Sequence, residues 1–332
     1  MTAFAYLIKC IKNLDYENMS KTAGYIAKKE KKIKLFILID MIRCGFKFKS
    51  GYNDYREFEF YTINDKKKAT FLTRGLNNNI IRNYNDRSKM DIFDDKIRFN
   101  ELFTDFIGRE WLDLRKATAE DFENFLKKYG SIIVKPYDGI CGKGIEKINY
   151  SDVTDAGELY NKLKENNQLL VENYLIQHHE MARINPSSVN TMRMFTFCKD
   201  GKSNLLQTIV KFGNNGVVDN FHSGGMYAFA DENGCVFTPA LDKADMVYKK
   251  HPYTGENILG FNVPMYKEAK ELVEKAALVV ESMGYVGWDV AVTEDGPVII
   301  EGNAYPGIFQ PRPSFTESHE GILPLYRKYM KF

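Results

Sequence analysis

The most informative segment of the chain, residues 287–303, reads Gly-Trp-Asp-Val-Ala-Val-Thr-Glu-Asp-Gly-Pro-Val-Ile-Ile-Glu-Gly-Asn. Apolar residues alternate around Asp289, and a second apolar run follows at 298–300, so both stretches are predicted to be strands. The four residues between them, Glu294-Asp295-Gly296-Pro297, are typical of a turn. The pattern therefore predicts a β-hairpin.

Three oxygen-bearing side chains stand on this hairpin. Antiparallel pairing would place Asp289 opposite Glu301, and Asn303, two residues further on, would point to the same face as Glu301. Two carboxylates and an amide oxygen suit a hard cation, Mg²⁺ best and Mn²⁺ also, with water and substrate phosphates as further ligands. The alternative is a buried acidic pair at a strand end, which the apolar neighbours would make costly. We therefore predict a divalent metal site at Asp289, Glu301 and Asn303.

The composition bounds the function. The chain has 332 residues, 44% hydrophobic and 27% charged, which is enough for two or three packed domains. Lys and Arg exceed Asp and Glu by 46 − 44 = 2, which argues against nucleic acid as the main partner. The five cysteines lack metal-binding spacing, so neither zinc nor a disulfide framework is expected. No segment is typical of a signal peptide or a bilayer span, and the expected localisation is cytoplasmic.

A local basic stretch lies near the N-terminus. Residues 21–34 contain six lysines against the single Glu30, and the apolar run 35–42 follows. A basic amphipathic helix can rest on anionic lipid, so peripheral membrane contact is one expectation. The favoured alternative is a solvated helical face whose apolar side packs on the rest of the protein.

The hydrophobic pattern indicates a mixture of helices and strands. Helical spacing occurs over residues 1–45, 94–106, 119–129 (with Thr118 as N-cap), 155–165 and 264–283. Short β-type runs occur at 132–135, 145–148, 169–172, 192–198 and 205–211. The order lacks strict strand–helix–strand alternation, so the predicted class is α+β rather than a doubly wound sheet.

A lysine and a glycine-rich loop suggest a phosphate site. The strand 132–135 ends at Lys135, whose flexible stem suits a phosphate oxygen. The loop that follows contains Asp138, Gly139, Gly142 and Gly144, and its glycines would expose backbone N–H groups and let the loop close on phosphates. The loop lacks the GK[ST] ending of a Walker A motif, and an ordinary turn is the alternative.

A strand running into an acidic residue suggests a nucleotide hinge. In the segment 169–175 the backbone could bind an adenine edge while Glu172 accepts from the adenine amino group. Glu180 could accept from ribose hydroxyls. A solvent-facing strand end is the alternative for Glu172, and structural or surface roles are expected for His178, His179 and His222.

These three segments, in this order, resemble the ATP-grasp superfamily. Further motifs resemble the sugar-transfer-associated ATP-grasp family: Gln-His at 177–178, Asn-Pro-Ser-Ser-Val-Asn-Thr-Met-Arg at 185–193, Asn-Phe-His-Ser-Gly-Gly at 220–225 and His-Pro-Tyr-Thr-Gly at 251–255. Upstream, Asp-Tyr-Arg-Glu-Phe at 54–58 and Asp-Lys-Ile at 95–97 also fit. The resemblance covers roughly residues 50–310 and is most specific in its C-terminal part.

The resemblance implies an α+β ATP-grasp fold of three lobes, with ATP between the middle and C-terminal lobes and a helical N-terminal extension. The expected boundaries are 1–50 for the extension, 51–130 for the N-terminal lobe, 131–190 for the middle lobe and 191–332 for the C-terminal lobe. It also implies roles for residues that match the family. Lys96 and Lys135 would be the nucleotide lysines, Glu172 and Tyr174 the adenine hinge, Glu180 the ribose contact, and Asp289, Glu301 and Asn303 the Mg²⁺ ligands.

Candidates for the acceptor side follow from the same motifs. Arg193 begins a predicted strand, and a guanidinium there could stabilise charge on a transferring phosphoryl group. Lys211 ends a predicted strand. Asn220 precedes Gly224 and Gly225, whose N–H groups could hold an anionic intermediate.

The activity implied by the resemblance is an ATP- and Mg-dependent carboxylate–amine ligase that acts through an acyl phosphate. Its substrates would be ATP, a carboxylate and an amine, with an amino acid or peptide joined to a sugar in surface polysaccharide synthesis. Two alternatives stay open: a kinase with the same grip on ATP, and a non-catalytic nucleotide-binding scaffold for sugar-transfer enzymes. The intact metal trio argues against the scaffold, and the residues do not separate ligase from kinase.

Overall fold

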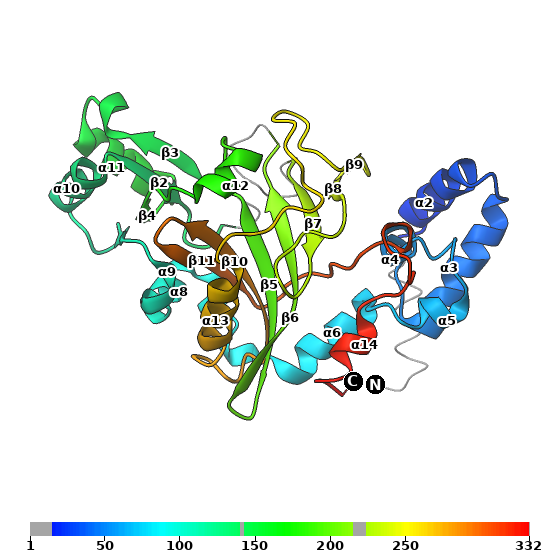
Figure 1. The fold of residues 1–332 in the computed structure, drawn as a ribbon. Coiled ribbons are helices and arrows are strands. Elements are labelled where there is room, and N and C mark those ends of the chain that lie inside the picture. Colours follow the sequence, from blue (N-terminus) through cyan, green and yellow to red (C-terminus); the bar gives the residue numbers. More distant parts are fainter. Residues whose placement is uncertain (1–14, 140–142, 215–223, 332) are drawn as a thin grey trace. The chain divides into compact units, whose positions relative to one another are not determined.

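The computed structural model describes residues 15–139, 143–214 and 224–331. The contacts within the chain divide it into two compact units (Figure 1). Unit 1 comprises residues 1–80 and 308–332, and unit 2 comprises residues 81–307.

Unit 1 is helical. Aromatic and aliphatic side chains from several helices form one buried cluster, in which Phe60 and Phe71 pack edge to face with ring centroids 5.5 Å apart. The elements are α2 (Tyr16–Lys29), α3 (Lys34–Phe48), α4 (Tyr52–Glu57), α5 (Asp65–Lys68), the start of α6 (Arg74–Tyr84), the 3-10 helix η4 (Pro313–Phe315) and α14 (Leu323–Tyr326).

The sequence of helix α2 accounts for where the helix begins and which of its faces is buried. Asp15 caps its N-terminus by accepting from the backbone N–H of Asn18 at 3.0 Å. Its buried residues, Met19, Ala23 and Ile26, recur every three or four positions and form one stripe. No helix among the described residues has both the length and the apolarity that crossing a bilayer requires.

Unit 2 contains a four-stranded antiparallel sheet in the order β1-β4-β2-β3. Helices α10 and α11 bury Phe122, Leu126 and Leu163 against Ile132, Val134 and Val171 of the sheet. A capping box between Thr118 and Asp121 begins α10, as Thr118 predicted. The elements are β1 (Trp111–Asp113), α10 (Ala119–Tyr129), β2 (Ser131–Lys135), β3 (Glu146–Asn149), η2 (Tyr150–Asp152), α11 (Ala156–Glu165) and β4 (Leu170–Asn173).

A seven-stranded antiparallel sheet in the order β11-β10-β5-β6-β7-β8-β9 makes up most of the rest of unit 2. Short helices precede it in the chain, α12 comes directly before β5, and α13 lies between β9 and β10. The elements are η1 (Arg87–Lys89), α7 (Asp91–Asp94), α8 (Lys96–Leu102), α9 (Thr104–Ile107), α12 (His179–Ile184), β5 (Thr191–Lys199), β6 (Lys202–Phe212), β7 (Met226–Ala230), β8 (Ala240–Asp242), β9 (Val247–Tyr248), α13 (Tyr266–Ala276), β10 (Tyr285–Thr293) and β11 (Gly296–Asn303).

The predicted hairpin is β10–β11, and Asp289 lies opposite Glu301 as its pattern predicted. A bulge between Asp289 and Val290 interrupts the register. The connection is shorter than the four residues expected, because β11 already begins at Gly296 and Pro297 pairs with Val292. Since β11 is an edge strand, the missing N–H of Pro297 does not prevent pairing.

The two faces of β10 have different surroundings. Trp288 is buried and packs on Phe93, Phe99 and Phe103, with ring centroids 5.4–6.4 Å away, and its indole N–H donates to Thr196 Oγ1 at 2.8 Å. Asp289 points to the opposite face because side chains alternate along a strand. One face thus anchors α7–α9, and the other carries charged groups.

Two helix predictions were too long. Residues 94–106 form three short helices, because Asp95 leaves the helical conformation and accepts from the N–H groups of Ile97 and Arg98 as the N-cap of α8. The third of these, α9, ends at Gly108 with φ of 54°. Helix α13 covers only 266–276 of the expected 264–283.

Candidate functional site

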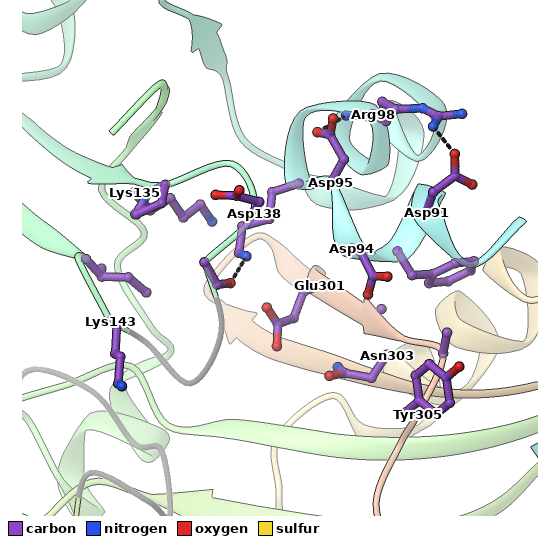
Figure 2. A pocket seen from close by; sticks show the side chains of 17 residues that line it. Asp91, Asp94, Asp95, Arg98, Lys135, Asp138, Lys143, Glu301, Asn303 and Tyr305 are labelled. Atoms are coloured by element: carbon purple, nitrogen blue, oxygen red, sulfur yellow. Dashed lines mark hydrogen bonds and ion pairs between the residues drawn. The ribbon is translucent and has the colours of Figure 1, made fainter. Parts of the chain in front are cut away.

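A cavity of about 710 Å³ lies within unit 2 and brings three distant segments together (Figure 2). One wall comes from α7 and α8, a second from the end of β2 and the glycine-rich loop, and a third from the end of β11. Its lining residues are Asp91, Phe93, Asp94, Asp95, Lys96, Arg98, Lys135, Pro136, Asp138, Gly139, Lys143, Ile145, Glu301, Gly302, Asn303, Ala304 and Tyr305. Six of them were predicted site residues: Lys96, Lys135, Asp138, Gly139, Glu301 and Asn303.

Lys135 enters this cavity from a buried charge network. Its Nζ lies 2.7 Å from Glu172 Oε2, and Glu172 Oε1 is 2.9 Å from both the Arg109 guanidinium and Asn100 Nδ2. The strands β2 and β4 create the contact, because Ile133 pairs with Glu172 and Lys135 is the next residue on the same face. Strand pairing therefore holds the ammonium group at the cavity wall.

Arg109 and Lys135 stabilise the ionised form of the Glu172 carboxylate. Burial alone would raise the pKa of Glu172, but the Arg109 and Lys135 cations outweigh it and lower that pKa to about 2. Burial, helped by the Arg109 charge, lowers the pKa of Lys135, and Glu172 opposes that change. Glu172 was predicted to accept from an adenine amino group; in the structure both of its carboxylate oxygens contact protein donors, and it does not line the cavity.

Lys96 and the glycine-rich loop are joined directly. The Lys96 N–H donates to Tyr137 O at 2.8 Å, and its ammonium group donates to Gly139 O. Gly144 has φ of 72°, and a Cβ there would lie 2.9 Å from the Pro136 ring, so both conformation and space favour glycine. Gly142 lies outside the described residues. The lysine from α8 thus reaches the backbone beside Lys135.

Glu301 and Asn303 present oxygen atoms at the third wall. Asn303 Nδ2 donates to Gly287 O at 3.3 Å, a bond that does not use its amide oxygen. Figure 2 shows Asp94 of α7 pointing toward the end of β11 that carries these two residues. Carboxylate and amide oxygens are ligands that fit Mg²⁺.

Asp289, the third predicted metal ligand, lies in a separate cluster of charges. Arg193 Nε donates to its Oδ1 and an Arg193 terminal nitrogen to its Oδ2 at 2.8 Å, while Lys211 Nζ is 2.9 Å from Oδ2. Burial would raise the pKa of Asp289, but these cations hold it well below its usual range. The structure therefore joins Arg193 and Lys211 to Asp289 by pairing of β10, β5 and β6.

The surroundings of the oxygen atoms of Asp289, Glu301 and Asn303 show which of these residues could bind a divalent cation. Glu301 and Asn303 line the cavity, whereas both oxygens of Asp289 contact cations and Asp289 does not line it. Two of the three residues fit directly. Asp289 would join them only if Arg193 or Lys211 gave up its contact.

Other predicted residues that the structure describes do not line the cavity. Tyr174 carries the Lys147 ammonium 3.8 Å above its ring centroid, and Glu180 on α12 accepts from Arg183 at 3.0 Å. Gly224 has φ of 101°, which favours glycine, and Gly225 directly precedes β7. Asn220 and His222 lie outside the described residues.

His178 and His179, for which structural or surface roles were expected, lie in one cluster with Glu294. The rings of His178 and His179 stack with centroids 4.3 Å apart, and Glu294 Oε1 accepts from the His179 backbone N–H at 2.8 Å. His178 Nδ1 accepts from the N–H of Glu180 as the N-cap of α12. These contacts tie the start of α12 to the β10–β11 turn.

Sequence reasoning missed several residues of the site. Arg109 and Asn100 hold Glu172 from behind, and Arg109 also donates to Ile299 O at 2.6 Å and Ile300 O at 3.0 Å. One buried arginine therefore links the wall bearing Lys135 to the strand bearing Glu301. In the sequence, Arg109 is distinguished only as a charged residue shortly after the helix expected at 94–106. Asp94 and Lys143 of the cavity wall were also missed.

The comparison with family models identifies the family of this chain. The model of the sugar-transfer associated ATP-grasp family matches residues 75–312. No curated protein matches the chain significantly. Among solved structures, carboxyaminoimidazole ribonucleotide synthase from Aspergillus clavatus, complexed with ATP, is 15% identical with a TM-score of 0.42, over 64% of this chain and 45% of that one.

Two further solved structures show similar values. D-cycloserine synthetase DcsG is 15% identical with a TM-score of 0.41, over 71% of this chain and 69% of its own. D-alanine–D-alanine ligase from Bacillus anthracis is 13% identical with a TM-score of 0.40, over 76% and 69%. The chain spans about half the length of the Aspergillus synthase. Because the family model covers most of the sequence, the chain belongs to the sugar-transfer-associated ATP-grasp family.

Proposed function

We propose that this protein is an ADP-forming ATP-grasp ligase that joins a carboxylate to an amine and requires Mg²⁺. The observation that carries the proposal is the cavity, which places Lys96, Lys135, Glu301 and Asn303 on facing walls. Cations for phosphate oxygens and oxygen donors for a divalent ion are what a bound nucleotide triphosphate needs. Family membership supports the same conclusion.

Lys135 and Lys96 are proposed to bind the phosphates of ATP, with the backbone at Asp138 and Gly139 beside them. Lys135 has a fixed contact with Glu172 at 2.7 Å, so its side chain is held in place before nucleotide arrives. Such fixed charges stabilise a transferring phosphoryl group without reorganising first. Tyr174 is proposed to contact the adenine and Glu180 the ribose. Gly144 is proposed to belong to the loop that closes on the phosphates, and Gly142 is included in that loop from its sequence alone.

Glu301 and Asn303 would hold Mg²⁺, and Asp289 would complete the set after release from a cation. When bound, the ion neutralises charge on the phosphates. Arg193 and Lys211 would then be available to the phosphoryl group or the acyl phosphate, with Asn220, Gly224 and Gly225. Their contacts with Asp289 support such an exchange, since one carboxylate controls both cations.

The proposed chemistry has two steps. A carboxylate oxygen attacks the γ-phosphorus, a C–O–P linkage forms, the bond from phosphorus to the β,γ-bridging oxygen breaks, and ADP leaves. The amine nitrogen then attacks the carbonyl carbon, the C–N bond forms, and phosphate departs with its oxygen while the nitrogen loses a proton. The cavity supplies position and charge, and needs no protein nucleophile.

The substrates are proposed from the family alone. An amino acid or peptide would be attached to a sugar in surface polysaccharide synthesis, in the cytoplasm, where ATP is available.

ADP release across a panel of acids and amines, with mass spectrometry of products, tests this function. We expect ADP only when both a carboxylate and an amine are present, with a product lighter than their sum by one water. ADP formed with a hydroxyl acceptor alone, together with a phosphorylated product, would identify a kinase and contradict the ligase.

A further inference from the structure

Helix α3 of unit 1 is apolar on two opposite faces. Ile37, Met41, Cys44 and Phe48 are buried in the unit 1 core. A second stripe with the same four-three-four spacing is displaced from it by two residues, which is about 200° around a helix. That stripe consists of Leu35, Ile39, Ile42 and Phe46, which are 46–61% exposed.

The second stripe is a continuous apolar surface rather than a set of isolated exposed residues. Phe36, 64% exposed, and Ile33, 63% exposed, extend it toward the N-terminus of α3. A helix that is apolar all round is normally buried on all sides. A continuous apolar surface of this kind marks a place where something else binds.

Five lysines lie close in sequence to the N-terminal end of this stripe. Lys28 and Lys29 end α2, Lys31 and Lys32 lie in the connection, and Lys34 begins α3; all five are exposed. Among the described residues, neither Lys28, Lys31 nor Lys34 forms an ion pair. The chain as a whole has a net charge of only +2, so this concentration of positive charge is local.

Glu30 is the single acidic residue among these lysines, and the nearby acidic residues of α3 and α5 are already paired. Asp65 is paired with Arg43 and Lys47 at 2.7 Å, and Asp40 is paired with Lys68 at 2.8 Å. A second copy meeting this stripe with its own unit 1 would therefore bring little free acidic surface. An anionic lipid surface offers both things the patch lacks: an apolar layer for the stripe and negative charge for the lysines.

We propose that the exposed stripe of α3 and the lysines at 28–34 form a docking surface for an anionic membrane. The apolar side chains enter the boundary between headgroups and acyl chains, and the lysines bind the headgroups. This surface belongs to unit 1 and does not depend on the nucleotide cavity of unit 2. Membrane docking and ligase activity can therefore fail separately.

Flotation of the full-length protein with lipid vesicles tests the proposal. One set of vesicles contains phosphatidylcholine alone, and the other contains phosphatidylcholine with phosphatidylserine. We expect binding to the anionic vesicles only, weakened by added salt because screening reduces the attraction of the lysines. Ile39→Ser with Phe46→Ser should lower the partition coefficient by about tenfold or more, since both side chains leave the lipid.

Matched variants separate docking from other effects. Lys28→Gln with Lys31→Gln and Lys34→Gln should weaken binding to anionic vesicles and its salt dependence. Met246→Ser with Val247→Ser removes two exposed apolar residues from unit 2 and should leave binding unchanged. Lys135→Ala, in the cavity, should also leave it unchanged.

Two results would overturn the proposal. The first is wild-type protein that does not bind anionic vesicles, as expected if residues 1–14 or a second copy cover the stripe. The second is binding that the Ile39→Ser, Phe46→Ser double variant retains in full while its circular dichroism spectrum matches wild type.

Discussion

The ammonium nitrogen of Lys135 lies 2.7 Å from the carboxylate of Glu172, and both side chains are almost fully buried. Arg109 approaches the same carboxylate at 2.9 Å from the other side. Two cations thus share one anion at the wall of the cavity. The arrangement fixes Lys135 in place, and it makes Glu172 necessary to the stability of unit 2.

Glu172→Gln should therefore destabilise the protein strongly. The change leaves two buried cations without a counter-charge, and breaking a buried pair costs about 3–5 kcal/mol. Urea unfolding measures the loss. Glu123→Gln, which removes an exposed partner of Lys127 on α10, is the control and should change little. Equal stability of the Glu172 variant and wild type would show that the network contributes nothing.

The same carboxylate predicts a pH dependence. Its pKa is about 2 in the folded protein against an ordinary 4.5, so the unfolded chain takes up the proton first as the pH falls. The stability from this group is complete above pH 4.5 and is lost progressively toward pH 2, about 3 kcal/mol in all. The stability difference between wild type and Glu172→Gln should shrink over that window. A difference that stays constant from pH 5 to 2.5 would contradict the assignment.

Lys135→Ala should weaken ATP binding by about 1.5–3 kcal/mol, the size of a charge-assisted hydrogen bond. Isothermal titration with a non-hydrolysable ATP analogue gives the affinity, and a melting curve confirms the fold. Lys127→Ala, on the exposed surface of α10, is the control. Unchanged affinity in a folded Lys135 variant would exclude a phosphate contact.

Glu301→Gln should lower the affinity for a divalent ion by about tenfold or more, because a carboxylate ligand is lost while the shape is kept. Electron paramagnetic resonance with Mn²⁺ in the presence of ADP measures binding directly, apart from activity. Asp91→Asn is a control within the same cavity, since Asp91 is paired with Arg98. Equal Mn²⁺ affinity in wild type and the Glu301 variant would place the ion elsewhere.

Arg193→Ala decides between two roles. The Arg193 guanidinium contacts the buried carboxylate of Asp289, which Lys211 also contacts. Removing the guanidinium takes away one of these two cations, so the melting temperature should fall by several degrees. If Arg193 also stabilises the phosphoryl group, kcat should fall far more than KM for ATP rises. Arg193→Lys should restore neither fully, because a point charge lacks the planar fork. A destabilised variant with normal kcat would leave only the pairing role.

The sequence was most informative where the pattern is local. The alternation around Asp289 predicted the hairpin and its register with Glu301, and Thr118 predicted the start of α10. Lys135 and Lys96 were named from motifs, and both line the cavity. These features depend on the alternation of side chains along a strand, on helix caps and on short motifs. Residues only a few positions apart determine all of them.

Contacts between distant segments were not predictable in this way. Arg109 reaches Glu172 and the carbonyl groups of β11 only because β1, β4 and β11 come together in space. The pairing of Asp289 with Arg193 and Lys211 likewise depends on the order of three strands in the sheet. A single sequence shows charged residues at these positions but not which charges meet.

ADP release should be measured with each substrate omitted in turn and the product weighed by mass spectrometry, because this experiment separates a ligase from a kinase. A ligase predicts that ADP forms only with ATP, Mg²⁺, a carboxylate and an amine together. It also predicts that the product contains acid and amine less one water, and that Lys135→Ala lowers both at ATP concentrations that do not saturate the variant. Substrate-dependent ADP release that needs no amine, or a product that carries phosphate, would contradict it.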